Sequence, residues 1–194
     1  MSQGGAYSWA DLRLTANLIT LGRILLSPLL FALILAASDD RGASWAVVAV
    51  GWVLGASDYY DGKLARSSDS VSRWGAFLDP LADKVMILGA AWCFVAVDRL
   101  FWVPVAIITV RELLISGARI RWARDGLSLP ARRSAKLKTL MQGAALSVAG
   151  LPPLEARDWA VSLAIWLAVA ITVYTGWRYW GDGRAGAVSA AGRG

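Results

Sequence analysis

The chain has 194 residues, of which 57% are hydrophobic and only 18% are charged, and it carries a formal net charge of +6 at pH 7. A water-soluble domain is typically about 45–50% apolar and about 25% charged, so the composition favours a membrane protein and excludes a disordered, collagen-like or coiled-coil chain. The absence of histidine and the presence of a single cysteine exclude histidine-based acid–base catalysis and disfavour a zinc site.

Six apolar segments, separated by short loops rich in Gly, Pro, Ser, Asp and Arg, predict six helices. At about 20 residues for each membrane-spanning helix, they fill most of the chain, so we expect one all-α integral membrane domain over residues 17–180. Within residues 1–16, Ser8–Ala16 predicts a short amphipathic interfacial helix, and the Gly/Ala-rich residues 181–194 predict a flexible cytoplasmic tail. The six predicted transmembrane helices are Asn17–Ala37, Ser44–Leu64, Trp74–Val97, Phe101–Trp122, Ser134–Leu151 and Trp159–Trp180.

Basic residues are distributed unevenly over the predicted loops. With the N-terminus in the cytoplasm, the outer loops hold only Arg41, Arg99 and Arg157 of the 20 Lys and Arg residues. This bias follows the positive-inside rule and predicts a multi-pass protein of the cytoplasmic membrane with both termini in the cytoplasm. The net positive charge is therefore interpreted as a face toward anionic membrane lipids, and no nucleic-acid partner is expected.

Four aspartates lie where the second predicted helix ends and the third begins: Asp58, Asp61, Asp79 and Asp83. Spacings of i,i+3 and i,i+4 place each pair on one helix face, and the short connection predicts antiparallel neighbours, so all four carboxylates can converge. An ionised side chain deep in a membrane helix costs about 2.5–3.5 kcal/mol, so something must compensate. An all-carboxylate site suits Mg²⁺ or Mn²⁺ completed by substrate phosphates. The alternative is buried ion pairs with Lys63, Arg66, Arg73, Lys84 or Arg111.

Two glycines and an arginine accompany these aspartates. Gly62 follows Asp61, and Gly75 lies four residues before Asp79, so a diphosphate or a metal ion could approach the backbone at either glycine. Close helix packing explains these glycines equally well. Arg66 could bind a phosphate group through two parallel hydrogen bonds.

The same segment carries a spaced signature. It consists of Asp58, two residues, Asp61-Gly62, two residues, Ala65-Arg66, eight residues, Gly75, three residues, Asp79, three residues and Asp83. At all eight specified positions it resembles the signature of the CDP-alcohol phosphotransferase family. Residues 17–23 and 77–84 also resemble this family, so the resemblance extends over most of the chain.

The resemblance implies a six-helix membrane enzyme, commonly a homodimer, whose site opens to the cytoplasm. In this family an alcohol attacks the β-phosphorus of a CDP-linked donor, and CMP is released. The resemblance also implies that two ions, Mg²⁺ or Mn²⁺, are bound by four aspartates and that one of them, Asp83, is also the general base. The four are Asp58, Asp61, Asp79 and Asp83. The donor contacts that we predict are Asn17, Thr20, Gly62, Arg66, Ser72 and Gly75.

Basic residues in the second half of the chain predict a phosphorylated acceptor. The candidate phosphate contacts are Arg111, Arg119, Lys136, Lys138 and Arg178, whereas Arg121, Arg124, Arg132 and Arg133 are better explained as membrane anchors. Arg111 lies too far inside its helix to be only an anchor, although Glu112 is a candidate partner for it.

The same segments of the fourth and fifth helices also resemble the phosphatidylglycerophosphate synthases of the family. The pattern consists of Arg111-Glu112, Ser116-Gly117-x-Arg119 and Lys136-x-Lys138-Thr139-x-x-Gln142. The resemblance implies CDP-diacylglycerol as donor and sn-glycerol 3-phosphate as acceptor, although Ala135 stands where that branch usually has Gly.

Other functions are compatible with parts of this pattern. A synthase of the same family could use phosphatidylglycerol, giving cardiolipin, or an inositol phosphate as its acceptor. An ion- or proton-coupled transporter could also use membrane carboxylates, but the chain shows no inverted repeat and its acids gather toward one membrane face. A structural scaffold would have no use for four converging aspartates.

Overall fold

The computed structural model describes residues 15–67, 73–124 and 133–191, and every regular element within these ranges is helical. Side chains near several helix ends, including those of residues 57–67 and 73–83, lie outside the described part. The α-helices are α1 (Thr15–Ala36), α2 (Trp45–Ser67), α3 (Arg73–Ala96), α4 (Trp102–Arg124), α5 (Arg133–Gly150) and α6 (Asp158–Ala191), with short 3-10 turns η2 (Ser38–Asp40) and η3 (Pro152–Leu154).

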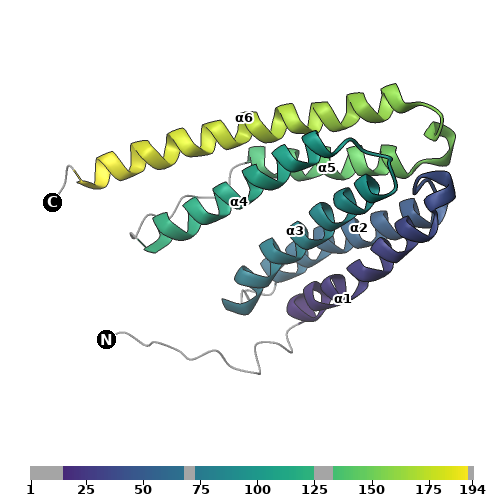
Figure 1. Cartoon of the computed structure of the whole chain (residues 1–194). Helices are drawn as coiled ribbons and strands as arrows, with labels where there is room; N and C mark the ends of the chain where they lie inside the picture. The colour runs from purple at the N-terminus through teal and green to yellow at the C-terminus, as the bar shows by residue number, and fades with distance from the viewer. Residues whose placement is uncertain (1–14, 68–72, 125–132, 192–194) are drawn as a thin grey trace.

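The observed helices coincide with the six predicted apolar segments to within a few residues, apart from the end of α6. Residues 181–194 were expected to form a flexible tail, whereas α6 continues to Ala191, past the end of α4 in Figure 1. Alanine is the strongest helix former, so the alanines of this segment partly offset its three glycines, each of which costs a helix about 1 kcal/mol. Most of the predicted interfacial helix, Ser8–Ala16, lies outside the described residues.

The helices form an antiparallel bundle in which α1 packs against both α2 and α3, and α6 packs against both α4 and α5 (Figure 1). Both α2 and α3 contact mainly α1; α2 also contacts α5, and α3 also contacts α4 and, to a lesser extent, α5. α1 thus supplies most of the surface on which both pack, and the predicted direct contact of α2 with α3 near the four aspartates stays a prediction. The halves that carry the four aspartates lie toward the 68–72 connection, and their side chains are outside the described part.

Phe94 of α3 is one of the most deeply buried side chains, at 1% exposure. Gly42, in the turn between α1 and α2, packs directly on its ring and has a positive φ of 81°. A side chain at this position would be strained in its backbone and would meet the Phe94 ring at about 3.0 Å. The Gly42 turn thus allows the chain to reverse closely over the core.

One helical segment of the described chain, Asp158–Gly181, is long and apolar enough to cross a membrane by length and composition. Three shorter apolar segments lie in α1, α2 and α3, at Ile24–Ala36, Trp45–Ala56 and Lys84–Ala96. Many large apolar side chains on these helices are exposed, including Trp52, at 62%.

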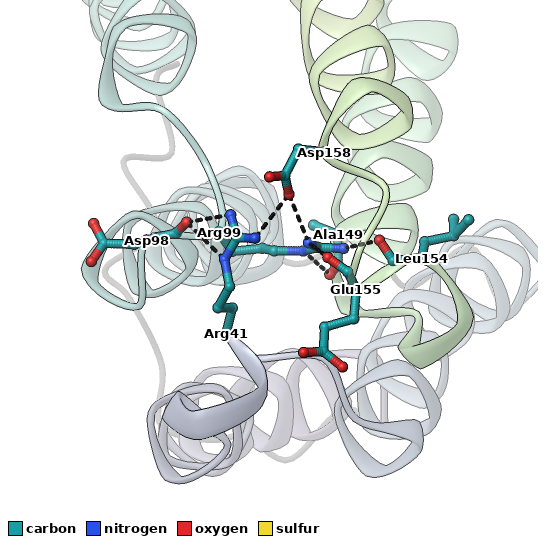
Figure 2. A network of polar contacts seen from close by, with 7 residues as sticks. All are labelled: Arg41, Asp98, Arg99, Ala149, Leu154, Glu155 and Asp158. Atoms are coloured by element: carbon teal, nitrogen blue, oxygen red, sulfur yellow. Dashed lines mark hydrogen bonds and ion pairs between the residues drawn. The ribbon is translucent and has the colours of Figure 1, made fainter.

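A buried arginine joins the loops at one end of the bundle (Figure 2). Arg99, in the α3–α4 loop, donates hydrogen bonds to the main-chain oxygens of Ala149, Leu154 and Glu155 at 2.6–2.9 Å. Its side chain is fully buried, and its Nη1 atom lies 3.3 Å from the Asp158 carboxylate. Burial, and next the like charge of Arg41, lower the pKa of Arg99, while the Asp158 carboxylate opposes this shift.

Arg41 extends this network to the α1–α2 loop. Its guanidinium donates to Asp158 Oδ1 at 2.9 Å and to the main-chain oxygen of Asp98 at 2.9 and 3.3 Å. Asp98 has a positive φ of 55°, a conformation that aspartate tolerates better than most residues. All three loops predicted to lie outside the membrane are therefore joined by side-chain contacts at one end of the molecule.

We expect Arg99→Met to lower the free energy of unfolding by about 2 kcal/mol or more, because the main-chain oxygens of Ala149 and Glu155 lose the Arg99 donor and each buried acceptor left without a donor costs about 1–3 kcal/mol. The Leu154 oxygen keeps the Arg157 N–H as a donor. Thermal unfolding of the purified protein in detergent would measure the loss. Arg157→Met is the matched control, since Arg157 lies in the same group of loops and is exposed. Equal unfolding temperatures for the two variants would contradict the role assigned to Arg99.

Candidate active site

The four aspartates lie on the helical halves that face the 68–72 connection. Asp58 and Asp61 belong to the second half of α2, and Asp79 and Asp83 to the first half of α3. The prediction that all four lie on helices is confirmed, so each pair shares one helix face. Their side chains are outside the described residues, and the convergence of the four carboxylates stays a prediction.

Most predicted donor contacts belong to the same end of the bundle. Asn17 and Thr20 lie in the first two turns of α1, Gly62 and Arg66 in the last two turns of α2, and Gly75 in the first turn of α3. The side chains at these positions, and Ser72 as a whole, lie outside the described part of the chain. The antiparallel order of α1, α2 and α3 brings these helix ends to the side opposite the Arg99 network.

Two of the predicted acceptor contacts meet at one buried carboxylate. Glu112 of α4 accepts a hydrogen bond from Arg111 Nη1 at 3.0 Å and one from Lys138 Nζ of α5 at 2.6 Å, both at its Oε1 atom. The side chains are 7% exposed for Glu112, 15% for Arg111 and 14% for Lys138. We call these three residues the Glu112 cluster; it combines two cations and one anion away from solvent.

Hydroxyl and amide groups of α5 and α6 continue the network. Arg111 Nη2 donates to the Thr175 hydroxyl at 3.0 Å, and this hydroxyl donates to the main-chain oxygen of Thr172. Gln142 Nε2 donates to the Thr172 hydroxyl at 3.0 Å. Thr172, Thr175 and Gln142 are all buried, so the polar groups of three helices depend on one another here.

The position of the Arg111 side chain also depends on a glycine of α6. Its Nε atom is buried without a hydrogen-bond partner and lies against Gly176 of α6, where a Cβ atom would be only 2.7 Å away. Real Cβ atoms essentially never come so close to another atom. Gly176 therefore leaves the space that the guanidinium occupies.

The remaining predicted acceptor contacts are placed differently. Arg119 of α4 is exposed, and Arg178 of α6 lies over the Tyr174 ring of its own helix, 6.0 Å from the ring centre. The contacts that the structure describes join neither of them to the Glu112 cluster. Lys136 is in the first turn of α5, but its side chain is outside the described residues.

Lys138 of the Glu112 cluster lies near Lys84 of α3. The positive charge of Lys84, the residue that follows Asp83, acts electrostatically on Lys138, as does that of Arg111. Lys84 and Lys138 are therefore close enough for their charges to interact. The Asp83 carboxylate lies outside the described residues, and its distance from the cluster stays a prediction.

A metal site is not found among the side chains that the structure describes, where no group of three or more His, Cys, Asp or Glu could hold an ion. The carboxylates of Asp58, Asp61, Asp79 and Asp83 are not among those side chains. Sequence reasoning missed Thr175 and Gly176 as parts of the arginine site. A Thr-Gly pair within an apolar helix gives no local signal, because its role depends on the packing of α6 against α4.

The sequence of this chain is similar to a protein-family model and to proteins of several bacteria. A family model described as CDP-alcohol phosphatidyltransferase matches residues 13–174. A Bacillus subtilis protein named CDP-diacylglycerol–glycerol-3-phosphate 3-phosphatidyltransferase is 34% identical over 182 residues, covering 84% of this chain and 91% of the relative. A Rickettsia typhi protein of the same name is 32% identical over 170 residues, covering 84% and 93%. A Mycobacterium tuberculosis protein named probable phosphatidylglycerophosphate synthase is 35% identical over 170 residues, covering 84% and 78%.

We expect Thr175→Val to lower the free energy of unfolding by about 1–3 kcal/mol, because it leaves the buried Arg111 Nη2 atom without its acceptor. Ser162→Ala on the exposed side of the same helix is the control and should change the stability by less than about 0.5 kcal/mol. Thermal unfolding in detergent measures both variants. An unchanged stability for Thr175→Val would mean that Arg111 finds an equivalent partner.

Proposed function

The chain belongs to the CDP-alcohol phosphatidyltransferase family, and we propose that it transfers the phosphatidyl group of CDP-diacylglycerol to sn-glycerol 3-phosphate, giving phosphatidylglycerophosphate and CMP. The observation that carries this choice of substrates is the likeness, across 84% of the chain, to relatives named for glycerol-3-phosphate 3-phosphatidyl transfer. The Glu112 cluster supports it, because buried arginine and lysine side chains suit the phosphate of such an acceptor.

Two divalent ions, Mg²⁺ or Mn²⁺, belong to the proposed site, and Asp58, Asp61, Asp79 and Asp83 would hold them. The residue types fit these ions, because carboxylates without His or Cys form a hard, oxygen-only donor set. The helical backbone supports the fit, since it keeps the members of each pair on one face. When bound, the ions neutralise the diphosphate of the donor and stabilise charge on the departing phosphate.

Asp83 is the proposed general base. Its carboxylate takes the proton of the acceptor hydroxyl while that oxygen forms a bond to the β-phosphorus of CDP-diacylglycerol. The bond between this phosphorus and the oxygen that bridges to CMP breaks, and CMP leaves with the bonding electrons. A carboxylate next to the reacting hydroxyl can accept this proton in the transition state, and it also orients the attacking oxygen.

The nucleotide-diphosphate of the donor is proposed to bind between the ends of α1, α2 and α3. Gly62 and Gly75 would let the phosphates approach the backbone, and Arg66 would bind a phosphate through two hydrogen bonds. Asn17, Thr20 and Ser72 are the further donor contacts that the family resemblance implies. Because this end of each helix faces the predicted cytoplasmic side, a lipid-linked donor could keep its acyl chains in the membrane.

The acceptor phosphate is proposed to bind at Arg111 and Lys138, with Arg119, Lys136 and Arg178 as further contacts. Arg111 and Lys138 share one carboxylate oxygen of Glu112, so the Glu112 cluster keeps a net positive charge. This net charge of one offsets part of the charge of a phosphate dianion, and the further contacts would have to offset the rest. The proximity of Lys84 to Lys138 supports a site near Asp83.

We also propose that all six α-helices cross the cytoplasmic membrane, with both termini and the site on the cytoplasmic side. The exposed apolar side chains support this arrangement, because water-soluble monomers rarely expose large apolar surfaces; they include Leu25 (76%), Val53 (67%), Trp159 (68%) and Trp177 (81%). The small number of cations in the three loops at the Arg99 end agrees with an outer location. Membrane lipids would then surround the bundle, and the homodimer implied by the family resemblance stays a prediction.

We expect Asp83→Asn to abolish CMP release while largely preserving the binding of CDP-diacylglycerol, because the amide cannot accept the hydroxyl proton. Radiometric or chromatographic measurement of CMP, with purified protein in detergent and Mg²⁺ or Mn²⁺, provides the readout. Asp39→Asn, in the exposed η2 turn, is the matched control and should keep wild-type turnover. Near-normal turnover of Asp83→Asn would contradict its assignment as the base.

We expect Arg111→Ala and Lys138→Ala each to raise the glycerol 3-phosphate concentration needed for half-maximal CMP release by about ten- to a hundredfold, which corresponds to the loss of a charge-assisted hydrogen bond. The concentration dependence on CDP-diacylglycerol should change much less. Arg121→Ala, at an exposed position of α4, controls for the loss of a basic residue. An unchanged acceptor dependence in both variants would remove Arg111 and Lys138 from the acceptor site.

A further inference from the structure

The Glu112 cluster contains a residue to which the proposed reaction gives no direct role. Glu112 itself is an anion and would repel a substrate phosphate, yet it is buried between the two cations proposed to bind that phosphate. A buried carboxylate needs partners to offset its loss of hydration, and here both partners are the proposed acceptor contacts. A functional role of Glu112 must therefore act through Arg111 and Lys138.

Both cations are bound by the same Glu112 oxygen, Oε1, from different helices. Arg111 precedes Glu112 on α4, whereas Lys138 comes from α5 and makes the shorter contact of 2.6 Å. Without the carboxylate, two like charges at this separation in a low-dielectric interior would repel each other and turn toward solvent. Glu112 thus allows an arginine and a lysine to lie side by side inside the bundle.

The position of Arg111 depends on these contacts. Its buried Nε atom has no acceptor, which is costly for a charged donor, so the bonds of its terminal nitrogens to Glu112 and Thr175 must offset this cost. Gly176 allows the guanidinium to lie directly against the backbone of α6. The Glu112 carboxylate and the Thr175 hydroxyl therefore orient the guanidinium. The absence of a Cβ atom at Gly176 leaves room for it.

We propose that Glu112 is a positioning residue for the acceptor: its carboxylate holds Arg111 and Lys138 side by side, Gly176 provides the space for the guanidinium, and the acceptor phosphate thereby meets two prearranged cations. The inference rests on the proposed function, since it takes the anion that binds there to be the phosphate of the acceptor. Prearranged groups lose less conformational entropy when a ligand binds, so the arrangement raises acceptor affinity although Glu112 carries the same charge sign as the ligand.

The direct test is Glu112→Gln in the full-length protein, purified in detergent. We expect the glycerol 3-phosphate concentration for half-maximal CMP release to rise about tenfold or more, while the dependence on CDP-diacylglycerol stays within about twofold, as expected from the loss of a charge-assisted hydrogen bond. Glu112→Asp, which keeps the charge, should restore part of the loss. If Glu112 acts through Lys138, adding Glu112→Gln to Lys138→Met should cause little further change.

Gly176→Ala provides a second variant that leaves every charge in place. We expect it to shift the Arg111 guanidinium and to raise the same half-maximal acceptor concentration several-fold. Gly181→Ala, on the same helix, has open space around the added Cβ atom and should behave like wild type. If Glu112→Gln fails to fold, Gly176→Ala decides the question.

Acceptor binding can also be measured without turnover, from the rise in unfolding temperature that glycerol 3-phosphate causes. A rise in the wild type that is much smaller in Glu112→Gln and Gly176→Ala supports the inference. If the wild type shows this pattern but releases no CMP, the proposed function fails and the positioning role stands. If both variants keep the wild-type acceptor dependence and the wild-type rise in unfolding temperature, the positioning role is overturned and the proposed function stands.

Discussion

The buried guanidinium of Arg99 joins the α3–α4 loop to the α5–α6 loop, and the contacts at this end of the bundle are built around it. Carbonyl groups at helix ends have no partner within their own helix, and a buried charge is costly unless it is hydrogen-bonded. Arg99 meets both requirements by donating to one main-chain oxygen at the end of α5, to two in the α5–α6 loop and to Asp158. Arg41 adds the α1–α2 loop to the same network. The opposite helix ends carry the four aspartates and most of the predicted donor contacts.

The Glu112 cluster, inside the bundle, contains more positive than negative charges. Around Glu112, two cations share one carboxylate oxygen, and the Nε atom of Arg111 has no acceptor. A buried polar group without a partner needs an explanation, and a binding site is one such explanation. We interpret the contrast as a division of roles: the Arg99 network stabilises the bundle, while the Glu112 cluster, close to Lys84 of α3, retains charge for a substrate.

Local patterns predicted much of this molecule, because apolar run length determines where helices lie. Each of the six helices, and the helical location of the four aspartates, follows from the pattern of one apolar segment. The pairing of Arg111 with Glu112 follows from their adjacency in the sequence. The role of Arg99 does not, since its partners lie 50 to 59 residues away and nothing local distinguishes it from Arg157. Gly176 is similar, because its function arises only where α6 packs on α4. The continuation of α6 to Ala191 was missed because a run of glycine and alanine resembles a linker.

The most direct test of the account is the acceptor requirement for CMP release. Purified protein with CDP-diacylglycerol and Mg²⁺ or Mn²⁺ would be supplied with glycerol 3-phosphate, an inositol phosphate, phosphatidylglycerol or no acceptor. We predict CMP release only with glycerol 3-phosphate, together with the appearance of phosphatidylglycerophosphate. Release with a different acceptor would keep the family reaction and contradict the acceptor assigned here. Folded, donor-binding protein that releases no CMP under any of these conditions would contradict the transfer reaction itself.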